Sequence, residues 1–96
     1  MSVARFYTMR AADGKGDALE AAIADIVTAV SQVPGCEGAT MMRGIDDPNE
    51  FVFFEKWGSV EQHGEALKTV PPGALDAVNA NLAGPPDGKY LDWKLG

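Results

Sequence analysis

Hydrophobic residues along this chain follow two periodicities, one typical of strands and one typical of helices. Residues 3–10 are rich in side chains that favour an extended backbone, and an Ala-Ala-Asp-Gly segment ends the predicted strand. Farther on, hydrophobic residues recur at steps of three, four and seven, which predicts one face of a helix: Leu19, Ile23, Ile26, Val30 and Val33. Asp17 and Glu20 match an acidic capping box at its start, and Pro34-Gly35 ends it.

A hairpin is predicted in the middle of the chain. Residues 38–45 have strand character, weakened by two glycines, and the Asp-Asp-Pro-Asn segment at 46–49 favours a turn. The strand that follows is hydrophobic on both faces, with Phe51 and Phe53 on one and Val52 and Phe54 on the other. Such a strand needs cover on both sides of the sheet.

Helical character returns after this strand. Ser59 and Gln62 match a capping box, and the helix that they start carries one inward-facing stripe: Val60, His63, Leu67 and Val70. Next, between two clusters of Pro and Gly, a short helical segment carries Leu75, Val78 and Leu82. Residues 90–95 are predicted as the last strand, with one hydrophobic face: Leu91, Trp93 and Leu95.

The order strand, helix, strand, strand, helical segment, strand predicts an α+β fold. A βαββαβ order places the helices on one face of a four-stranded antiparallel sheet, which is the ferredoxin-like arrangement. A length of 96 residues fits one domain spanning 1–96. Because the helices cover one face and the third strand needs cover on both, we expect a homodimer in which two sheets pack face to face.

Composition and charge narrow the class of partner. The net charge of −6 and the scattered Lys and Arg residues argue against a nucleic-acid partner. The single cysteine, Cys36, has no disulfide partner and no metal-ligand spacing around it, so we expect a small hydrophobic residue near the start of a strand. The sequence shows no signal peptide and no hydrophobic run long enough to span a membrane, and we expect a cytoplasmic protein.

Candidate chemistry gathers at the corner between the aromatic strand and the next helix. His63, the only histidine, is a candidate general base because an ordinary His titrates near neutral pH; the alternative is a hydrogen-bonded core residue. Glu55 shares a face with Trp57 if the strand has no bulge, and burial would then raise its pKa and make it a rival base. With a bulge, Glu55 turns outward to pair with Arg or Lys. Trp57 either belongs to the core or donates its indole N–H to a bound carbonyl.

The first strand adds three candidates on one face, namely Arg5, Tyr7 and Met9. Arg5 either stabilises a phenolate or carboxylate in a pocket or forms a salt bridge between subunits.

The central part of the chain resembles the antibiotic-biosynthesis-monooxygenase-like family of the dimeric α+β barrel superfamily. The matching features are Pro34-Gly35-Cys36, the turn at Asp47-Pro48 and the corner Glu55-Lys56-Trp57-Gly58-Ser59. The resemblance implies a dimer with a pocket in each subunit between sheet and helices. Some members of the family use molecular oxygen on polycyclic phenols or quinols without a metal or an organic cofactor, so we expect no cofactor here.

One branch of the family binds and degrades haem with an Asn in the first strand, a Trp at the end of the third and a His in the following helix. Met9 occupies the Asn position in this chain, and Trp57 matches the Trp. The His position falls near Leu67, one turn after His63. Two of the three features differ from the pattern of the haem-degrading branch, which argues against haem degradation. Haem binding through His63 stays open as an alternative.

These residues lead to the hypothesis of a monooxygenase that acts on a small aromatic phenol or quinol. The predicted catalytic residues are His63, as the base, with Glu55 as its rival, and Trp57. The predicted substrate contacts are Arg5, Tyr7, Met9, Phe53 and Leu67. Two alternatives stay open: a non-catalytic dimer that binds a small aromatic or lipid-like ligand, and an isomerase or lactone-forming enzyme on the same barrel.

Overall fold

A computed structural model describes residues 2–96 and contains four strands and three helices. In chain order these are β1 (Val3–Arg10), α1 (Gly16–Val30), β2 (Cys36–Arg43), β3 (Glu50–Trp57), α2 (Val60–Leu67), α3 (Asp76–Ala80) and β4 (Asp87–Asp92). The observed order confirms the predicted βαββαβ pattern, with the second helical segment divided into α2 and α3.

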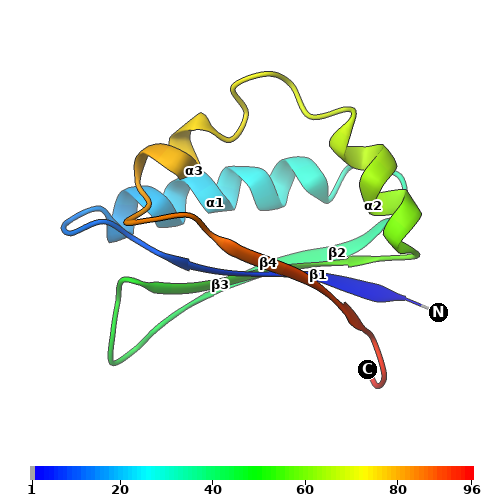
Figure 1. The fold of residues 1–96 in the computed structure, drawn as a ribbon, viewed down its shortest axis with the longest axis horizontal. Coiled ribbons are helices and arrows are strands. Elements are labelled where there is room, and N and C mark those ends of the chain that lie inside the picture. Colours follow the sequence, from blue (N-terminus) through cyan, green and yellow to red (C-terminus); the bar gives the residue numbers. More distant parts are fainter. Residues whose placement is uncertain (1) are drawn as a thin grey trace.

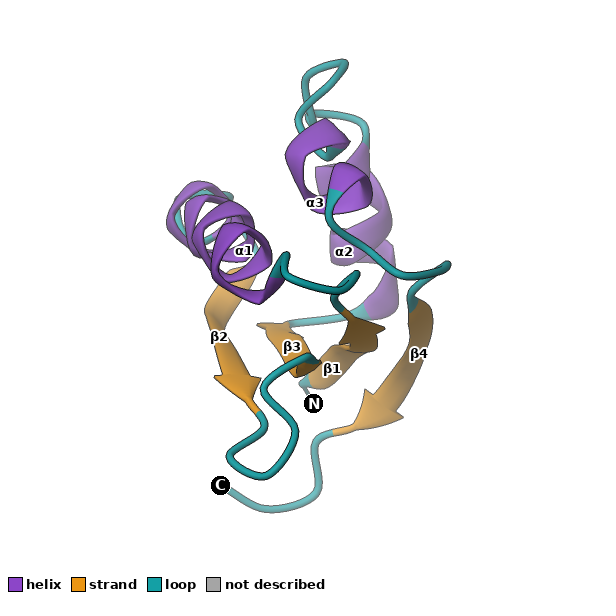
Figure 2. Ribbon diagram, turned by 90° about the vertical axis from the view of Figure 1, so that its left-hand side faces the viewer, coloured by secondary structure: helices purple, strands orange, loops and turns teal. Residues whose placement is uncertain are grey.

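The strands form one antiparallel sheet in the order β2-β3-β1-β4. Figure 1 shows α1, α2 and α3 on the same side of this sheet, and the view along the layers in Figure 2 shows the opposite face without a helix. The fold is therefore the predicted ferredoxin-like α+β arrangement. The hairpin of β2 and β3 is also confirmed, from Cys36 paired with Trp57 to Arg43 paired with Phe51.

Two strand boundaries differ from the prediction. The strand expected at 38–45 begins at Cys36 and contains a bulge between Cys36 and Gly38, where Gly38 has a φ of +156° that side chains rarely adopt. The strand expected at 90–95 runs instead from Asp87 to Asp92, because its pairing partner β1 begins at Val3. Leu95 therefore lies beyond the sheet and is 92% exposed.

The start of α1 also differs from the prediction. The helix begins at Gly16, so Asp17 lies in its first turn and does not cap it. Arg43 on β2 holds both predicted capping carboxylates, with Nη1 2.9 Å from Asp17 and 3.1 Å from Glu20. A guanidinium that can reach two carboxylates competes successfully with a local capping bond, and here it ties α1 to β2.

The predicted cap of α2 is confirmed, and its predicted inward stripe is partly wrong. Ser59 Oγ accepts a hydrogen bond from the Gln62 backbone N–H at 3.1 Å. His63 and Ala66 are the buried residues of this short helix. The other members of the predicted stripe, Val60, Leu67 and Val70, are 41%, 53% and 42% exposed, because α2 packs on the sheet through His63 and Ala66.

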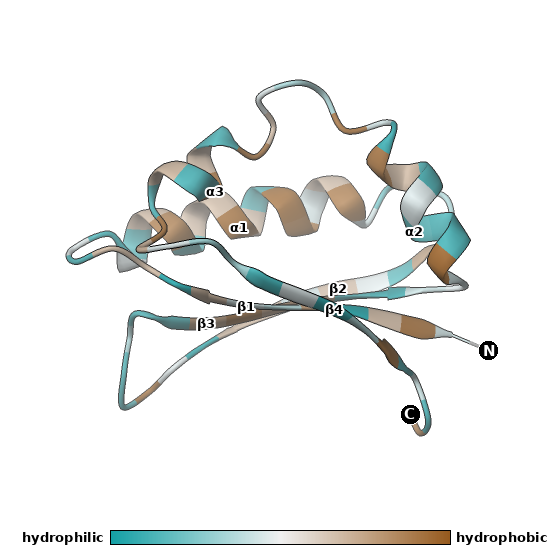
Figure 3. Cartoon of the chain, in the orientation of Figure 1, coloured by the Kyte–Doolittle hydropathy of each residue, from teal (hydrophilic) through white to brown (hydrophobic). Residues whose placement is uncertain are grey.

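The core lies between α1 and the inner face of the sheet. Its large buried side chains come from β3 and α1: Leu19, Ile23, Phe51 and Phe53. Figure 3 shows that β3 and α1 are largely hydrophobic, whereas α2 is mostly hydrophilic. On the outer face of the sheet, Val52 and Phe54 are only partly buried, in agreement with a strand that is hydrophobic on both sides.

Candidate functional site

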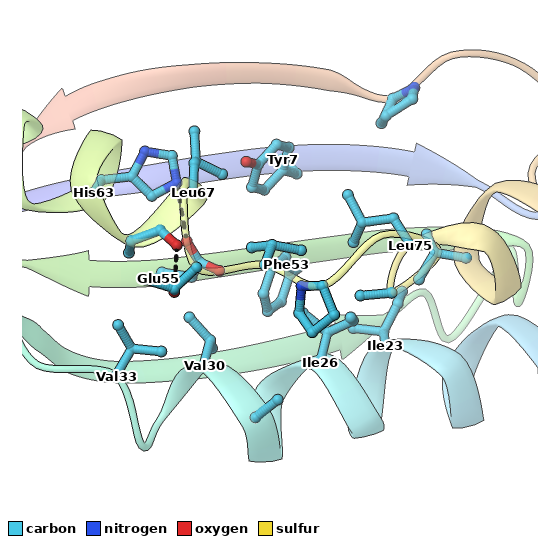
Figure 4. Close-up of a pocket in the computed structure, with 18 of the residues that line it drawn as sticks. Tyr7, Ile23, Ile26, Val30, Val33, Phe53, Glu55, His63, Leu67 and Leu75 are labelled. Carbon is cyan, nitrogen blue, oxygen red and sulfur yellow. Dashed lines mark hydrogen bonds and ion pairs between the residues drawn. The ribbon is translucent and has the colours of Figure 1, made fainter.

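A cavity of about 300 Å³ lies between the inner face of the sheet and the three helices. Its walls are mostly hydrophobic, which is typical of small-molecule sites. Figure 4 shows His63 and Glu55 at one end of this cavity and Leu75 at the other. The lining residues are Tyr7, Met9, Ile23, Ile26, Ala29, Val30, Val33, Phe53, Glu55, Trp57, His63, Ala66, Leu67, Thr69, Val70, Pro71, Ala74, Leu75, Val78, Asn79 and Pro86.

The end of β3 brings Glu55 and Trp57 together on the inner face. The register with β1 is regular here, with Val3 paired to Trp57 and Arg5 to Glu55, so the strand has no bulge on this side that could turn Glu55 outward. Trp57 is fully buried, and its Nε1 donates a hydrogen bond to Glu55 Oε1 at 3.0 Å. The indole N–H thus finds its acceptor within the protein.

His63 reaches the same point from α2 and is 3% exposed. Its Nε2 lies 3.6 Å from Glu55 Oε1, and its ring centroid is 5.4 Å from that of Trp57. Its Nδ1 lies 2.6 Å from the hydroxyl of Tyr90 on β4. The structure therefore brings together His63, Glu55 and Trp57, the three residues predicted to be catalytic.

Burial shifts both titratable groups of this cluster toward their neutral forms. It raises the pKa of the Glu55 carboxyl, against smaller opposing effects of the Trp57 hydrogen bond and the Arg5 charge. It lowers the pKa of His63, and the charge of Arg5 adds to this effect. The 3.6 Å contact between His63 and Glu55 has the partners of an ion pair, yet it is longer than a hydrogen bond. At this distance a buried carboxylate and a buried imidazolium would compensate each other poorly, so we assign His63 as neutral in this contact.

Four of the five predicted substrate contacts line the cavity: Tyr7, Met9, Phe53 and Leu67. Arg5 does not, contrary to the expectation. Its Nε donates to the Tyr7 hydroxyl at 3.1 Å, and its guanidinium carbon lies 4.9 Å from the ring centroid of Tyr7 and 4.6 Å from that of Tyr90. These contacts hold the cation over two aromatic rings at the β4 side of the sheet, outside the cavity.

Tyr90 is the residue of this cluster that the sequence analysis missed. The prediction for the last strand rested on its hydrophobic face of Leu91, Trp93 and Leu95. Because side chains alternate along a strand, Tyr90 belongs to the opposite face, which is the face that the helices cover. The alternation of side chains along the last strand was therefore enough to predict that Tyr90 faces the helices.

The remaining predictions concern the cysteine, metal binding and membrane segments. Cys36 is the first residue of β2 and is partly buried, as expected. Among residues 2–96, no group of three or more His, Cys, Asp or Glu side chains is arranged to hold a metal ion. None of the helices in this part of the chain is long and hydrophobic enough to cross a membrane.

Comparison with known proteins identifies the family. The family profile named Antibiotic biosynthesis monooxygenase matches residues 2–71. The chain belongs to this family. The comparison with curated proteins finds no match.

Several solved structures share the fold of this chain along nearly their whole length. A variant of SnoaB from Streptomyces nogalater, described as a cofactor-independent oxygenase, has a TM-score of 0.82 at 18% identity, with 99% of this chain and 95% of that chain covered. Rv0793 from Mycobacterium tuberculosis has a TM-score of 0.81 at 21% identity, with 100% and 98% covered. A protein of Chloroflexus aurantiacus that bears the family name has a TM-score of 0.73 at 25% identity, with 100% and 98% covered.

The residues of the cavity do not fit a haem group. Both ring nitrogens of His63 face protein atoms, Nδ1 toward Tyr90 and Nε2 toward Glu55. Leu67, at the position where a haem-ligating His was expected, offers no donor atom. The alternative of haem binding through His63 therefore has no support in this geometry.

Proposed function

We propose that this family member is a cofactor-independent monooxygenase that oxidises a small phenol or quinol in the cavity. The observation that carries the proposal is the buried Glu55 carboxyl beside His63, at the end of a hydrophobic cavity. The shared fold with SnoaB, a cofactor-independent oxygenase, adds support. A cavity of about 300 Å³ is at the small end of ligand-binding sites, which favours a compact substrate.

We assign the role of base to Glu55 and that of hydrogen-bond donor to His63, which reverses the preference from the sequence. The Nδ1 atom of His63 is engaged with Tyr90, and its Nε2 faces Glu55. Burial raises the pKa of Glu55, which brings a carboxylate closer to the basicity useful near neutral pH. In this mechanism Glu55 accepts the proton of the substrate hydroxyl, and the Nε2–H of His63 donates to the oxygen that becomes anionic.

The deprotonated ring then reacts with molecular oxygen. Proton loss makes the ring electron-rich, and the hydrophobic walls keep water away from the anion. In the net reaction the substrate loses two hydrogens and gains one oxygen atom, and the other oxygen atom leaves as water. Dioxygen takes up the four electrons that the substrate loses, so the reaction needs no external reductant.

The test is oxygen uptake by the purified, metal-free protein with a panel of quinols and polycyclic phenols. We expect protein-dependent uptake with at least one compact member of the panel, and a loss of about 10²–10⁴-fold in kcat in the Glu55→Gln variant, which keeps an acceptor for Trp57. A His63→Ala variant is expected to lose activity as well. A flat oxygen trace across the panel, or an unchanged kcat in Glu55→Gln, would refute the mechanism.

We also propose that two copies pair through the outer face of the sheet. On this face Phe6 and Phe54 stack at 6.1 Å between ring centroids, and Met42 and Leu91 are 54% and 42% exposed. Exposed hydrophobic side chains gathered on one face of a sheet are typical of an interaction surface. A Phe54→Lys variant should be monomeric by light scattering, while Ile45→Lys, at a fully exposed position, should keep the wild-type mass. A monomeric wild type would contradict the proposal.

A further inference from the structure

The hydroxyl of Tyr90 contacts the one ring nitrogen of His63 that does not face Glu55. We propose that Tyr90 is a positioning residue, which holds His63 in the tautomer with its proton on Nε2. His63 then presents an N–H donor at the polar end of the cavity. The tautomer itself follows from the contacts of the two nitrogens; only its role in turnover rests on the proposed function.

The two nitrogens of His63 have different surroundings. Nδ1 is 2.6 Å from the Tyr90 hydroxyl, and a phenol hydroxyl is a hydrogen-bond donor at neutral pH. Nε2 faces Glu55 Oε1, which already accepts the indole N–H of Trp57 at 3.0 Å. Because Glu55 Oε1 accepts this bond, it presents lone pairs to its neighbours. An unprotonated Nε2 would direct its own lone pair at this oxygen and be repelled. The arrangement therefore favours Nδ1 as the acceptor and Nε2 as the protonated nitrogen.

The Tyr90 ring is held in place by its neighbours. Tyr90 pairs with Arg5 across the β1–β4 ladder, and the Arg5 guanidinium carbon lies 4.6 Å from its ring centroid. The rings of Tyr90 and His63 meet edge to face, at 5.4 Å between centroids and an angle of 75°. The hydroxyl is thus directed at Nδ1 by a strand and a stacked cation, although the residue is 38% exposed.

The charged and titratable groups around His63 come from three strands. They are Glu55 on β3, Arg5 on β1 and Tyr90 on β4. The Arg5 charge and burial both disfavour a second proton on the ring. A neutral ring with one N–H must place that proton on one nitrogen, so the Tyr90 hydroxyl decides which side of His63 donates.

This inference narrows the class of ligand. The Nε2–H of His63 is a donor, so the ligand group beside it must be an acceptor, such as a phenol or quinol oxygen. The charge of Arg5 lies outside the cavity. We therefore expect the cavity to take a neutral ligand with an oxygen at its polar end.

Nitrogen NMR of the imidazole tests the tautomer directly. His63 is the only histidine of the chain, so its two ring-nitrogen signals in uniformly ¹⁵N-labelled protein need no further assignment to a residue. At neutral pH we expect Nε2 to have the shift of a protonated nitrogen and Nδ1 that of an unprotonated one. In Tyr90→Phe, which keeps the ring, the loss of one hydrogen bond should change the tautomer ratio by about fivefold and move both signals toward each other.

Tyr7→Phe is the matched control, since the hydroxyl that it loses bonds to Arg5 and not to His63. It should leave the tautomer as in the wild type. A wild-type spectrum with the proton on Nδ1 would overturn the proposal without any variant, and so would an unchanged tautomer ratio in a folded Tyr90→Phe. These spectra do not depend on turnover, so a failure of the proposed function leaves the tautomer result standing. With an accepted substrate, Tyr90→Phe should lower kcat more than it raises KM.

Discussion

The hydrogen bond from Trp57 to Glu55 predicts an unequal role for the two tryptophans. Trp57 is fully buried and donates to a carboxyl that is itself 5% exposed. Trp93 is only partly buried, and its Nε1 donates to the backbone oxygen of Gly96 at the C-terminus. Changing each Trp to Phe therefore removes one indole N–H in two contrasting environments.

The expected loss of stability can be worked out from these contacts. Removing the partner of a buried acidic group costs about 1.5–3 kcal/mol, and the space left by the smaller ring adds to this cost. We expect Trp57→Phe to lower the free energy of unfolding by about 2–4 kcal/mol, a large part of the 5–15 kcal/mol typical of a small domain. For a chain of this size, this corresponds to a fall in Tm of about 10–25 °C. Trp93→Phe should cost less than about 1 kcal/mol.

Urea unfolding followed by far-UV circular dichroism measures both variants with the same signal. Several protein concentrations are needed, because any contribution of a dimer interface to Trp93→Phe would make the transition depend on concentration. If Trp57→Phe destabilised the protein no more than Trp93→Phe does, the buried bond to Glu55 would not be what fixes this corner of the site.

Three further predictions concern the stability of single-residue variants. Burial raises the pKa of Glu55 in the folded state, so the contribution of the protonated Glu55 carboxyl to stability is lost as pH rises through that pKa. Glu55→Gln should therefore gain stability relative to wild type between about pH 5 and about pH 8. An equal difference in the free energy of unfolding between the two proteins at both pH values would contradict this prediction. Burial lowers the pKa of His63, so the contribution of His63 to stability has the opposite pH dependence; because the two side chains are in contact, the difference between the two proteins reports the pair. Gly64→Ala should add about 1 kcal/mol in thermal unfolding, because a methyl group there meets no atom within 4 Å. Gly44→Ala should instead destabilise the protein, because the added methyl group would clash with the backbone carbonyl of Asp47, which cannot move aside as a flexible side chain can. Leu67→Ala should cost less than about 1 kcal/mol because Leu67 is 53% exposed, while Leu19→Ala, fully buried in the core, should cost about 2–5 kcal/mol by urea unfolding.

Periodicity in the sequence was enough for the fold. The stripe of hydrophobic residues in α1, the strand-favouring residues of β1 and the aromatic run of β3 are strong local signals, and the predicted order of strands and helices fits one common arrangement, the ferredoxin-like fold. The cap at Asp17 was wrong because a long-range contact with Arg43 replaced a local bond. A local pattern cannot report such competition, since Arg43 lies 26 residues away.

The candidate site was only partly accessible to the same reasoning. Trp57 and Glu55 follow from strand alternation, and His63 from the inward face of α2. The roles of Glu55 and His63 depend on which atoms face each other, which requires the Tyr90 contact from the last strand. Arg5 was misplaced because a strand face shows the side of the sheet and not how far a long side chain turns away from the cavity.

The most direct test of the account follows the oxygen atoms. Metal-free protein is incubated with isotopically labelled dioxygen and a quinol or phenol that it accepts, and the product is analysed by mass spectrometry. The account predicts one labelled oxygen atom in the product and the other in water, with this incorporation lost in Glu55→Gln. A product formed without labelled oxygen, or one formed equally well by the variant, would contradict cofactor-independent oxygenation at this cavity.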